Sequence, residues 1–179
     1  RLVTQKFQFR LGGYGPATTS FSQALKLIGD RLEENFGNDV DVKYIWNIMD
    51  LGYRGEEILW LTEHGFLTIA YQSTSYLTDR VPELGFVDLP FLFQNNKAAR
   101  SAMDGALGDY LTRKIEEQIN YRVLGYLENG FRHISNRLRP VNVPDDLRDM
   151  RIRVLPSDVQ AKTFELLGAQ PRRLDLTEA

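Results

Sequence analysis

The chain has 179 residues, of which 42% are hydrophobic and 26% charged, and its formal net charge is -2. These values are close to the average of globular proteins, and a near-neutral chain has no global attraction to nucleic acid or to anionic membranes. The absence of cysteine excludes disulfides and thiolate metal sites. No apolar run approaches the ~20 residues of a membrane span.

The two ends of the sequence carry different signals. The first 13 residues contain no apolar stretch of the kind that a signal peptide has, but a mature exported protein whose leader has been removed would begin in the same way. At the other end, Asp175–Ala179 reads as the opening of a helix, with an acid and a Thr-Glu pair. We therefore expect the chain to be truncated at its C-terminus.

Strand and helix patterns alternate over the first 127 residues. Apolar periodicity predicts strands at Phe7–Leu11, Val40–Trp46, Phe66–Tyr71 and Arg122–Leu127, and helices at 18–36, Tyr53–His64 and Lys97–Gln118. The apolar run Gly85–Phe93 contains Pro90 and is predicted to form an extended bend, since proline interrupts a strand. This alternation predicts an α/β fold with a mostly parallel sheet.

The pattern changes at Gly130. A strand-like run around Arg132 leads into a loop rich in Pro and Asp, and then a strand, a helix and a strand are predicted at Arg151–Leu155, Ser157–Leu167 and Gln170–Leu176. We place a domain boundary near Leu127–Gly130. It separates a first α/β lobe, residues 1–128, from the hinge exit and the start of an incomplete second lobe, residues 129–179.

Few residues support an enzyme. The chain has two histidines, His64 and His133, and lacks the sequence motifs of serine hydrolases, zinc proteases and P-loop proteins. His64 precedes Gly65 at a predicted helix end, which is typical of a cap. His133, beside Arg132, could line a site or could be an ordinary strand residue.

The loop Gly12–Pro16 offers a weak alternative. It follows a predicted strand and precedes a helix, and a glycine-rich turn at that place exposes backbone N–H groups to an anion. The third glycine of a dinucleotide fingerprint is missing, because Thr18 occupies that position. The loop therefore leaves open an α/β enzyme or sensor domain that binds a phosphate or carboxylate there, or simply a tight turn.

Arginines gather in the last third of the chain. Arg132 and Arg153 lie on two predicted strands, and a guanidinium matches a carboxylate with two parallel hydrogen bonds. Arg151 shares a strand face with Arg153, and the sequence alone does not choose between them. Acids are interleaved with these bases, which argues against a nucleic-acid surface.

Several motifs occur here in the order in which a known family has them. The first two are a D-L-P-F-L-F run at Asp88–Phe93 and an N-G-x-R strand at Asn129–Arg132. The third is a D-L-x-G-x-K/R-x-R-V-P segment at Asp146–Pro156. A G-A-x-P turn at Gly168–Pro171 and a T/S-E pair at Thr177–Glu178 follow. Asp149 stands at the glycine of the third motif, and Leu155 is inserted before its proline. In these motifs the chain resembles the periplasmic solute-binding proteins of TRAP transporters, the DctP-like family.

The resemblance implies a two-lobed α/β periplasmic binding protein that is not an enzyme. It implies capture of a small organic acid and its delivery to TRAP membrane subunits, with no cofactor, metal or nucleic acid and no membrane span of its own. The family's carboxylate-binding arginine falls on Arg153 and a second site arginine on Arg132. Tyr14, Tyr53 and Ser73 correspond by position to residues of the cleft wall. Family members are longer, so the first lobe is expected to be largely present and the second only begun.

Overall fold

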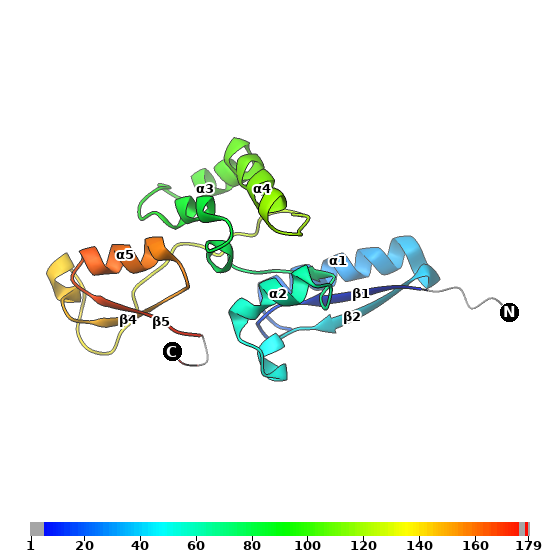
Figure 1. Ribbon diagram of the computed structural model, residues 1–179, viewed down its shortest axis with the longest axis horizontal. Helices are drawn as coiled ribbons and strands as arrows, with labels where there is room; N and C mark the ends of the chain where they lie inside the picture. Colours follow the sequence, from blue (N-terminus) through cyan, green and yellow to red (C-terminus); the bar gives the residue numbers. More distant parts are fainter. Residues whose placement is uncertain (1–5, 176–177, 179) are drawn as a thin grey trace. The chain divides into compact units, whose positions relative to one another are not determined.

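The computed structural model describes residues 6–175 and residue 178, so Leu176 and Thr177 of the predictions lie outside the described residues. The chain divides into two compact units, one up to Ser73 and the other from Thr74 onward. Each unit is of α/β type and has its own parallel sheet (Figure 1). The predicted α/β fold is therefore observed in both.

The first unit is built on a three-stranded parallel sheet of order β2-β1-β3. Its elements in chain order are β1 (Phe7–Gly12), α1 (Ser20–Phe36), β2 (Val40–Ile45), α2 (Ile58–Glu63) and β3 (Ile69–Ala70). The register of β1 with β2 runs from Phe7 opposite Val40 to Gly12 opposite Ile45. The predicted first two strands and the helix between them are confirmed within two residues.

Local signals explain where α1 begins and ends. The Thr19 side chain accepts a hydrogen bond from the backbone N–H of Ser22 and caps the first turn. Gly37, at a φ of 51°, ends the helix in a conformation that side chains disfavour. Leu25 lies on the buried face, and α1 packs on β1 and β2.

The next two elements are shorter than predicted. A 3-10 turn at Gly55–Glu57 replaces the start of the predicted second helix, so α2 has only six residues. Strand β3 has two residues and pairs only with Leu11 and Gly12 of β1. The length of a strand depends on the neighbouring strand with which it pairs, and the hydrophobic pattern of a segment carries no information about that neighbour.

Over its described residues, the second unit contains three α-helices and a two-stranded parallel sheet. These elements are α3 (Asn96–Met103), α4 (Ala106–Gln118), β4 (Arg151–Val154), α5 (Asp158–Leu166) and β5 (Gln170–Arg173). Arg153 of β4 lies opposite Arg172 of β5. The predicted strand, helix and strand after residue 150 are confirmed, with shorter ends.

The prediction of one long helix in this unit is wrong. The predicted helix over residues 97–118 is broken at Gly105, which has a non-helical conformation and serves as the N-cap of α4. Glycine is a poor helix former, so a break at this residue has a local cause. The run Gly85–Phe93, predicted as an extended bend, differs from the prediction in its first four residues. These belong to a 3-10 helix over Pro82–Asp88, which begins with Pro82, where the missing N–H of proline costs nothing. Beyond that helix Leu89 is extended and the chain turns at Pro90 and Phe91, as predicted around the proline.

The strand predicted at Arg122–Leu127 is also absent. Residues 121–136 form neither helix nor strand, so Arg132 does not lie on a strand either. The backbone N–H of Val123 donates to the Glu116 carboxylate at 3.0 Å. In a sheet this N–H would instead donate to a carbonyl of a neighbouring strand. The predicted boundary at Leu127–Gly130 falls in this segment and stays a prediction.

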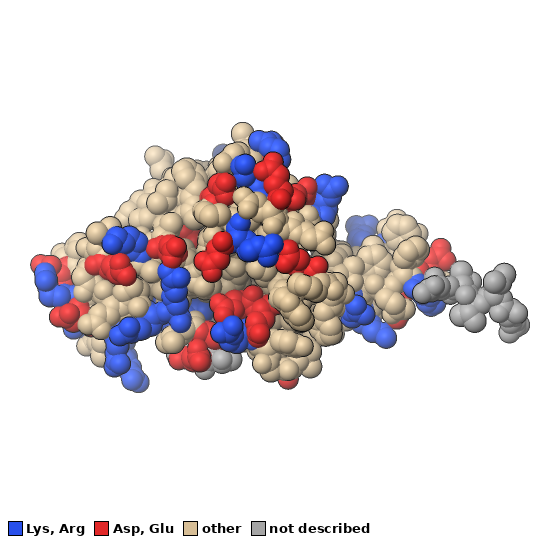
Figure 2. Space-filling view, in the orientation of Figure 1, with Lys and Arg blue, Asp and Glu red and all other residues tan. Residues whose placement is uncertain are grey.

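The surface carries mixed charge. Figure 2 shows basic and acidic side chains interspersed over the visible face, without a broad region of one sign. This matches the interleaving of acids and bases in the sequence. In the part of the chain that the structure describes, every helix is too short or too polar to cross a membrane.

Candidate functional site

The loops that follow the three parallel strands of the first unit are joined by backbone hydrogen bonds. Gly13 donates to the carbonyl of Ile45 at 3.3 Å, Ile48 donates to Gly13 at 2.9 Å, and Tyr71 donates to Gly12 at 3.3 Å. In open α/β sheets the carboxyl ends of the strands form the edge at which ligands bind. This edge is therefore the candidate binding surface of the first unit.

Two of the predicted residues meet at this edge. The Tyr14 hydroxyl oxygen accepts a hydrogen bond of 3.0 Å from the backbone N–H of Ser73. The Tyr14 ring lies 5.3 Å from the ring of Tyr71, which in turn lies 5.3 Å from Phe21. The four side chains, Tyr14, Phe21, Tyr71 and Ser73, are half-buried. The edge therefore has an aromatic surface whose rings are fixed by packing and which also carries polar atoms.

Tyr53 lies in the loop after β2. Its backbone N–H donates to Ile48 at 3.3 Å, and its half-buried ring lies against Phe66 with 6.5 Å between ring centroids. The loop is thus anchored to Ile48, which itself is bound to Gly13. The third predicted wall residue belongs to the same loop system as the first two.

The glycine-rich loop after β1 is explained by packing. The N–H groups of Gly13 and Gly15 donate to the carbonyls of Ile45 and Trp46 at 3.3 and 3.4 Å, so both are used within the fold. A Cβ at Gly13 would lie 2.1 Å from the Tyr71 ring. The close approach of that ring accounts for the glycine. The observation that favoured a phosphate site at Gly12–Pro16 is thereby removed.

Arg153 is the better placed of the two arginines on β4. It is half-buried whereas Arg151 is exposed, and its Nε donates to the Leu174 carbonyl at 3.0 Å. Within residues 6–175, no carboxylate forms an ion pair with Arg153. One N–H of the guanidinium is therefore used within the fold, and among the described residues no carboxylate pairs with its terminal nitrogens, the groups that a bidentate carboxylate contact can use.

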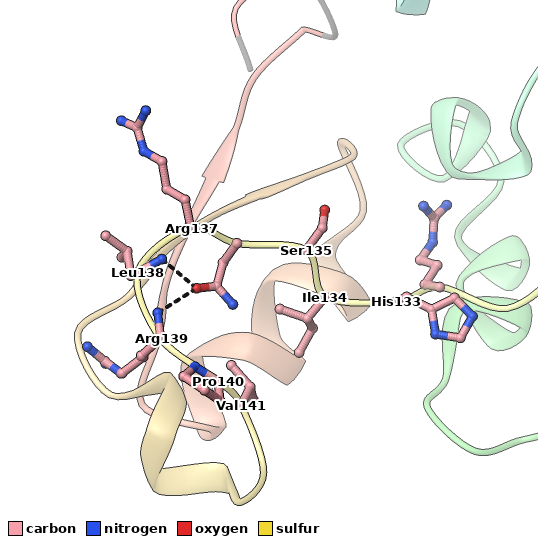
Figure 3. A pocket seen from close by; sticks show the side chains of 10 residues that line it. His133, Ile134, Ser135, Arg137, Leu138, Arg139, Pro140 and Val141 are labelled. Atoms are coloured by element: carbon pink, nitrogen blue, oxygen red, sulfur yellow. Dashed lines mark hydrogen bonds between the residues drawn. The ribbon is translucent and has the colours of Figure 1, made fainter.

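Arg132 has a different setting. It is one of residues 132–141, a continuous and mostly exposed segment that lines an open hollow. Figure 3 shows this segment. Asn136 shapes this segment, because its side-chain oxygen accepts from the backbone N–H groups of Leu138 and Arg139 at 2.8 and 3.0 Å. That Arg132 and Arg153 bind one ligand together stays a prediction.

Two further arginines hold the loop that leads into β4. Arg139 donates to the carbonyls of Asp146 and Arg148, each at 2.8 Å, and Arg148 pairs with Asp145 at 2.9 Å. Hydrogen bonds from the backbone N–H groups of Asn142 and Val143 lower the pKa of the Asp146 carboxyl. The cluster seen in the sequence is therefore largely structural.

The histidines do not form a reaction centre. Nδ1 of His64 lies 3.0 Å from the carbonyl of Trp60, as expected for a side chain at a helix end, and His133 is exposed in the segment around Arg132. Over the described ranges there is no cluster of three or more His, Asp or Glu side chains that could hold a metal ion.

Sequence reasoning missed a buried polar cluster in the second unit. The Asp88 carboxylate accepts hydrogen bonds from the side chains of Ser75, Ser157 and Gln160 at 2.7–3.1 Å. A signal was present, because an acid placed between Val87 and Leu89 in an apolar run needs polar partners when it is buried. Its partners, however, are 13 to 72 residues away in the sequence.

The whole of the chain from residue 11 to residue 179 matches the family described as bacterial extracellular solute-binding protein, family 7 (DctP). The chain is 30% identical over 150 residues to the C4-dicarboxylate-binding protein DctB of Bacillus subtilis, an alignment that covers 84% of the chain and 42% of that protein. It is 28% identical over 178 residues to the 2,3-diketo-L-gulonate-binding periplasmic protein YiaO of Escherichia coli, covering 99% and 52%.

Solved structures give the same result. A TRAP periplasmic solute-binding protein from Sulfurospirillum deleyianum with bound succinate has a TM-score of 0.89 at 26% identity, covering 97% of the chain and 55% of that protein. The sugar acid binding protein DctPAm from Advenella mimigardefordensis, in complex with galactonate, has a TM-score of 0.88 at 28% identity, with the same coverage. The chain spans about half the length of these relatives.

These matches confirm the resemblance stated from the motifs, and the predicted fold. The α/β architecture is that of the TRAP periplasmic solute-binding proteins, of which the chain covers a part. The relatives are binding proteins of transport systems and not enzymes. The chain therefore belongs to the DctP family of bacterial extracellular solute-binding proteins.

Proposed function

We propose that the protein carrying this chain captures a small organic acid in the periplasm and delivers it to TRAP membrane subunits. Family membership and the carboxylates named with the similar structures, succinate and galactonate, support this. The observation that carries the proposal is Arg153, a half-buried arginine fixed through Nε and without an acidic partner among the described residues.

In this proposal no bond is made or broken. The terminal nitrogens of Arg153 bind the ligand carboxylate, and Arg132 acts as a second donor. Tyr14, Tyr53 and Ser73 form the wall that contacts the rest of the ligand. Contacts that form only in the closed protein shift it toward closure about a hinge near residues 127–130.

A thermal-shift screen tests this function. The natural protein should be heated with succinate, galactonate and galacturonate, and with the uncharged amides of the same acids as matched controls. A ligand at ~100 times its Kd adds ~2.7 kcal/mol to the free energy of unfolding, so a bound acid should raise the melting temperature clearly while its amide does not. Equal shifts with acid and amide, or none with any acid, would contradict the proposal.

Substitutions of Tyr14 test its proposed place in the wall of the ligand site. Tyr14→Ala removes both the ring against Tyr71 and the acceptor for the Ser73 N–H, whereas Tyr14→Phe removes only the acceptor. We expect Tyr14→Ala to weaken binding or to change the order of preference among the acids, and Tyr14→Phe to have a smaller effect. Calorimetric titration measures this, with circular dichroism to show that the fold persists. Unchanged affinity in a folded Tyr14→Ala variant would exclude Tyr14 from the site.

A further inference from the structure

The half-buried carboxylate of Asp88 is the centre of a hydrogen-bond network with three buried side chains. The Ser157 hydroxyl donates to it at 2.7 Å, the Ser75 hydroxyl at 3.0 Å and the Gln160 amide at 3.1 Å. The Gln160 amide also donates to the Ser75 hydroxyl at 3.1 Å. The Ser75 and Ser157 side chains are 1% and 0% exposed, so water does not readily replace these contacts.

The network fixes the turn that leaves β4. The Ser157 hydroxyl donates to Asp88 and at the same time accepts from the Gln160 backbone N–H at 3.3 Å, which makes it the N-cap of α5. The Gln160 side-chain oxygen accepts from the N–H of Leu155 at 3.3 Å. Leu155 is two residues beyond Arg153. A single carboxylate thus orients both the start of α5 and the end of β4.

A second contact joins the same two segments. The Thr78 hydroxyl lies 3.0 Å from the carbonyl of Pro156, and α5 packs on the 3-10 helix that ends at Asp88. The 3-10 segments before residue 89 therefore form the support on which the β4–α5 turn rests. Because Arg153 is on the short strand that enters this turn, its position depends on that support.

We propose that Asp88 is a positioning residue for ligand binding, acting through the β4–α5 turn on Arg153. The inference rests on the proposed function, in which Arg153 binds the ligand carboxylate. Asp88 is an acceptor for three donors, and its charge strengthens those hydrogen bonds. Binding through a bidentate guanidinium is sensitive to small displacements, because both hydrogen bonds must align at once.

Asp88→Asn is the variant that tests this role. It keeps the shape of the side chain but places an NH2 group where one carboxylate oxygen accepted hydrogen bonds, so at least one donor must turn away. We expect about tenfold weaker binding of succinate or galactonate by the natural protein, equivalent to about 1.4 kcal/mol. Tyr126→Phe is the matched control, since it removes the contacts of its hydroxyl with Thr112 at 3.0 Å and Gly108 at 3.4 Å, neither of which is part of the Asp88 network.

A double-mutant cycle separates positioning from general loss of stability. If Asp88 acts through Arg153, then Asp88→Asn in an Arg153→Ala background should reduce affinity less than twofold further, because coupled residues are not additive. An equal tenfold loss in both backgrounds would overturn the inference. Melting temperatures of all variants show whether each remains folded at the temperature of the titration.

A readout without ligand keeps this test independent of the proposed function. In the 15N-edited spectrum, the Nε–H signal of Arg153 reports its hydrogen bond to Leu174. We expect Asp88→Asn to shift this signal and Tyr126→Phe to leave it in place. An unshifted signal in Asp88→Asn overturns the positioning role. If the natural protein binds no acid but the signal shifts, the proposed function fails and the structural link from Asp88 to Arg153 stands.

Discussion

Arg153→Ala is expected to weaken binding of the organic acid to the natural protein by a factor of ~30 or more. The substitution leaves the ligand carboxylate without its bidentate partner, and truncating one member of a buried charge pair costs ~2–5 kcal/mol. The half-buried position of Arg153 and its hydrogen bond to Leu174 indicate that the ordering of the side chain precedes binding. Calorimetric titration with the acid found in the thermal screen gives the affinity.

Two further variants decide whether the arginine is the right one. Arg153→Lys keeps the charge but not the planar fork of donors, so it should recover only part of the loss. Arg151→Ala is the matched control on the same strand, and because Arg151 is exposed it should be nearly silent. If Arg151→Ala proves the more damaging change in folded protein, the assignment of the anchor is wrong.

Gly13→Ala is expected to destabilise the first unit by ~1–3 kcal/mol, the usual cost of forcing extra atoms into a packed site. The new Cβ would lie 2.1 Å from the Tyr71 ring, which must leave its contacts with Tyr14 and Phe21. The predicted binding surface should therefore be disturbed together with stability. Chemical denaturation of the natural protein measures the free energy of unfolding.

Two further variants serve as controls for Gly13→Ala. Gly125→Ala meets no atom within 4 Å and should leave stability almost unchanged. Tyr71→Ala removes the ring with which the new methyl group would collide, so adding Gly13→Ala to it should cost little more. A loss of equal size in the presence and absence of the Tyr71 ring would show that the glycine is needed for its backbone conformation instead.

Elements with a complete local signal were predictable from the sequence. Helix α1 has a cap at Thr19, an apolar face and a terminal glycine, and in β1 and β2 on either side of it apolar residues alternate with polar ones. The break at Gly105 also had a local signal, the glycine itself, which the prediction of one long helix overlooked. The missing strand at Arg122–Leu127 was not predictable, because it depends on what lies beside the segment: Glu116 takes the N–H of Val123.

The candidate site was predictable to a similar degree. Tyr14 and Ser73 each follow a predicted parallel strand, so both were expected at one edge of the sheet. In the structure they are hydrogen bonded to each other. The choice of Arg153 over Arg151 came from the family motif, and exposure now supports it. The role of Asp88 could not be derived from spacing, because its partners come from distant parts of the chain.

The sequence separations within the two units imply an order of folding. The sheet of the first unit is complete at Ala70, and its strands are linked by short connections. Asp88 is 69 residues before Ser157, and Ser75 is 85 residues before Gln160. Loops of this length close slowly, and domains form from the N-terminus as the chain is synthesised. The sheet can thus assemble while Asp88 is still hydrated, and α5 receives the support of Asp88 only once these distant segments have met.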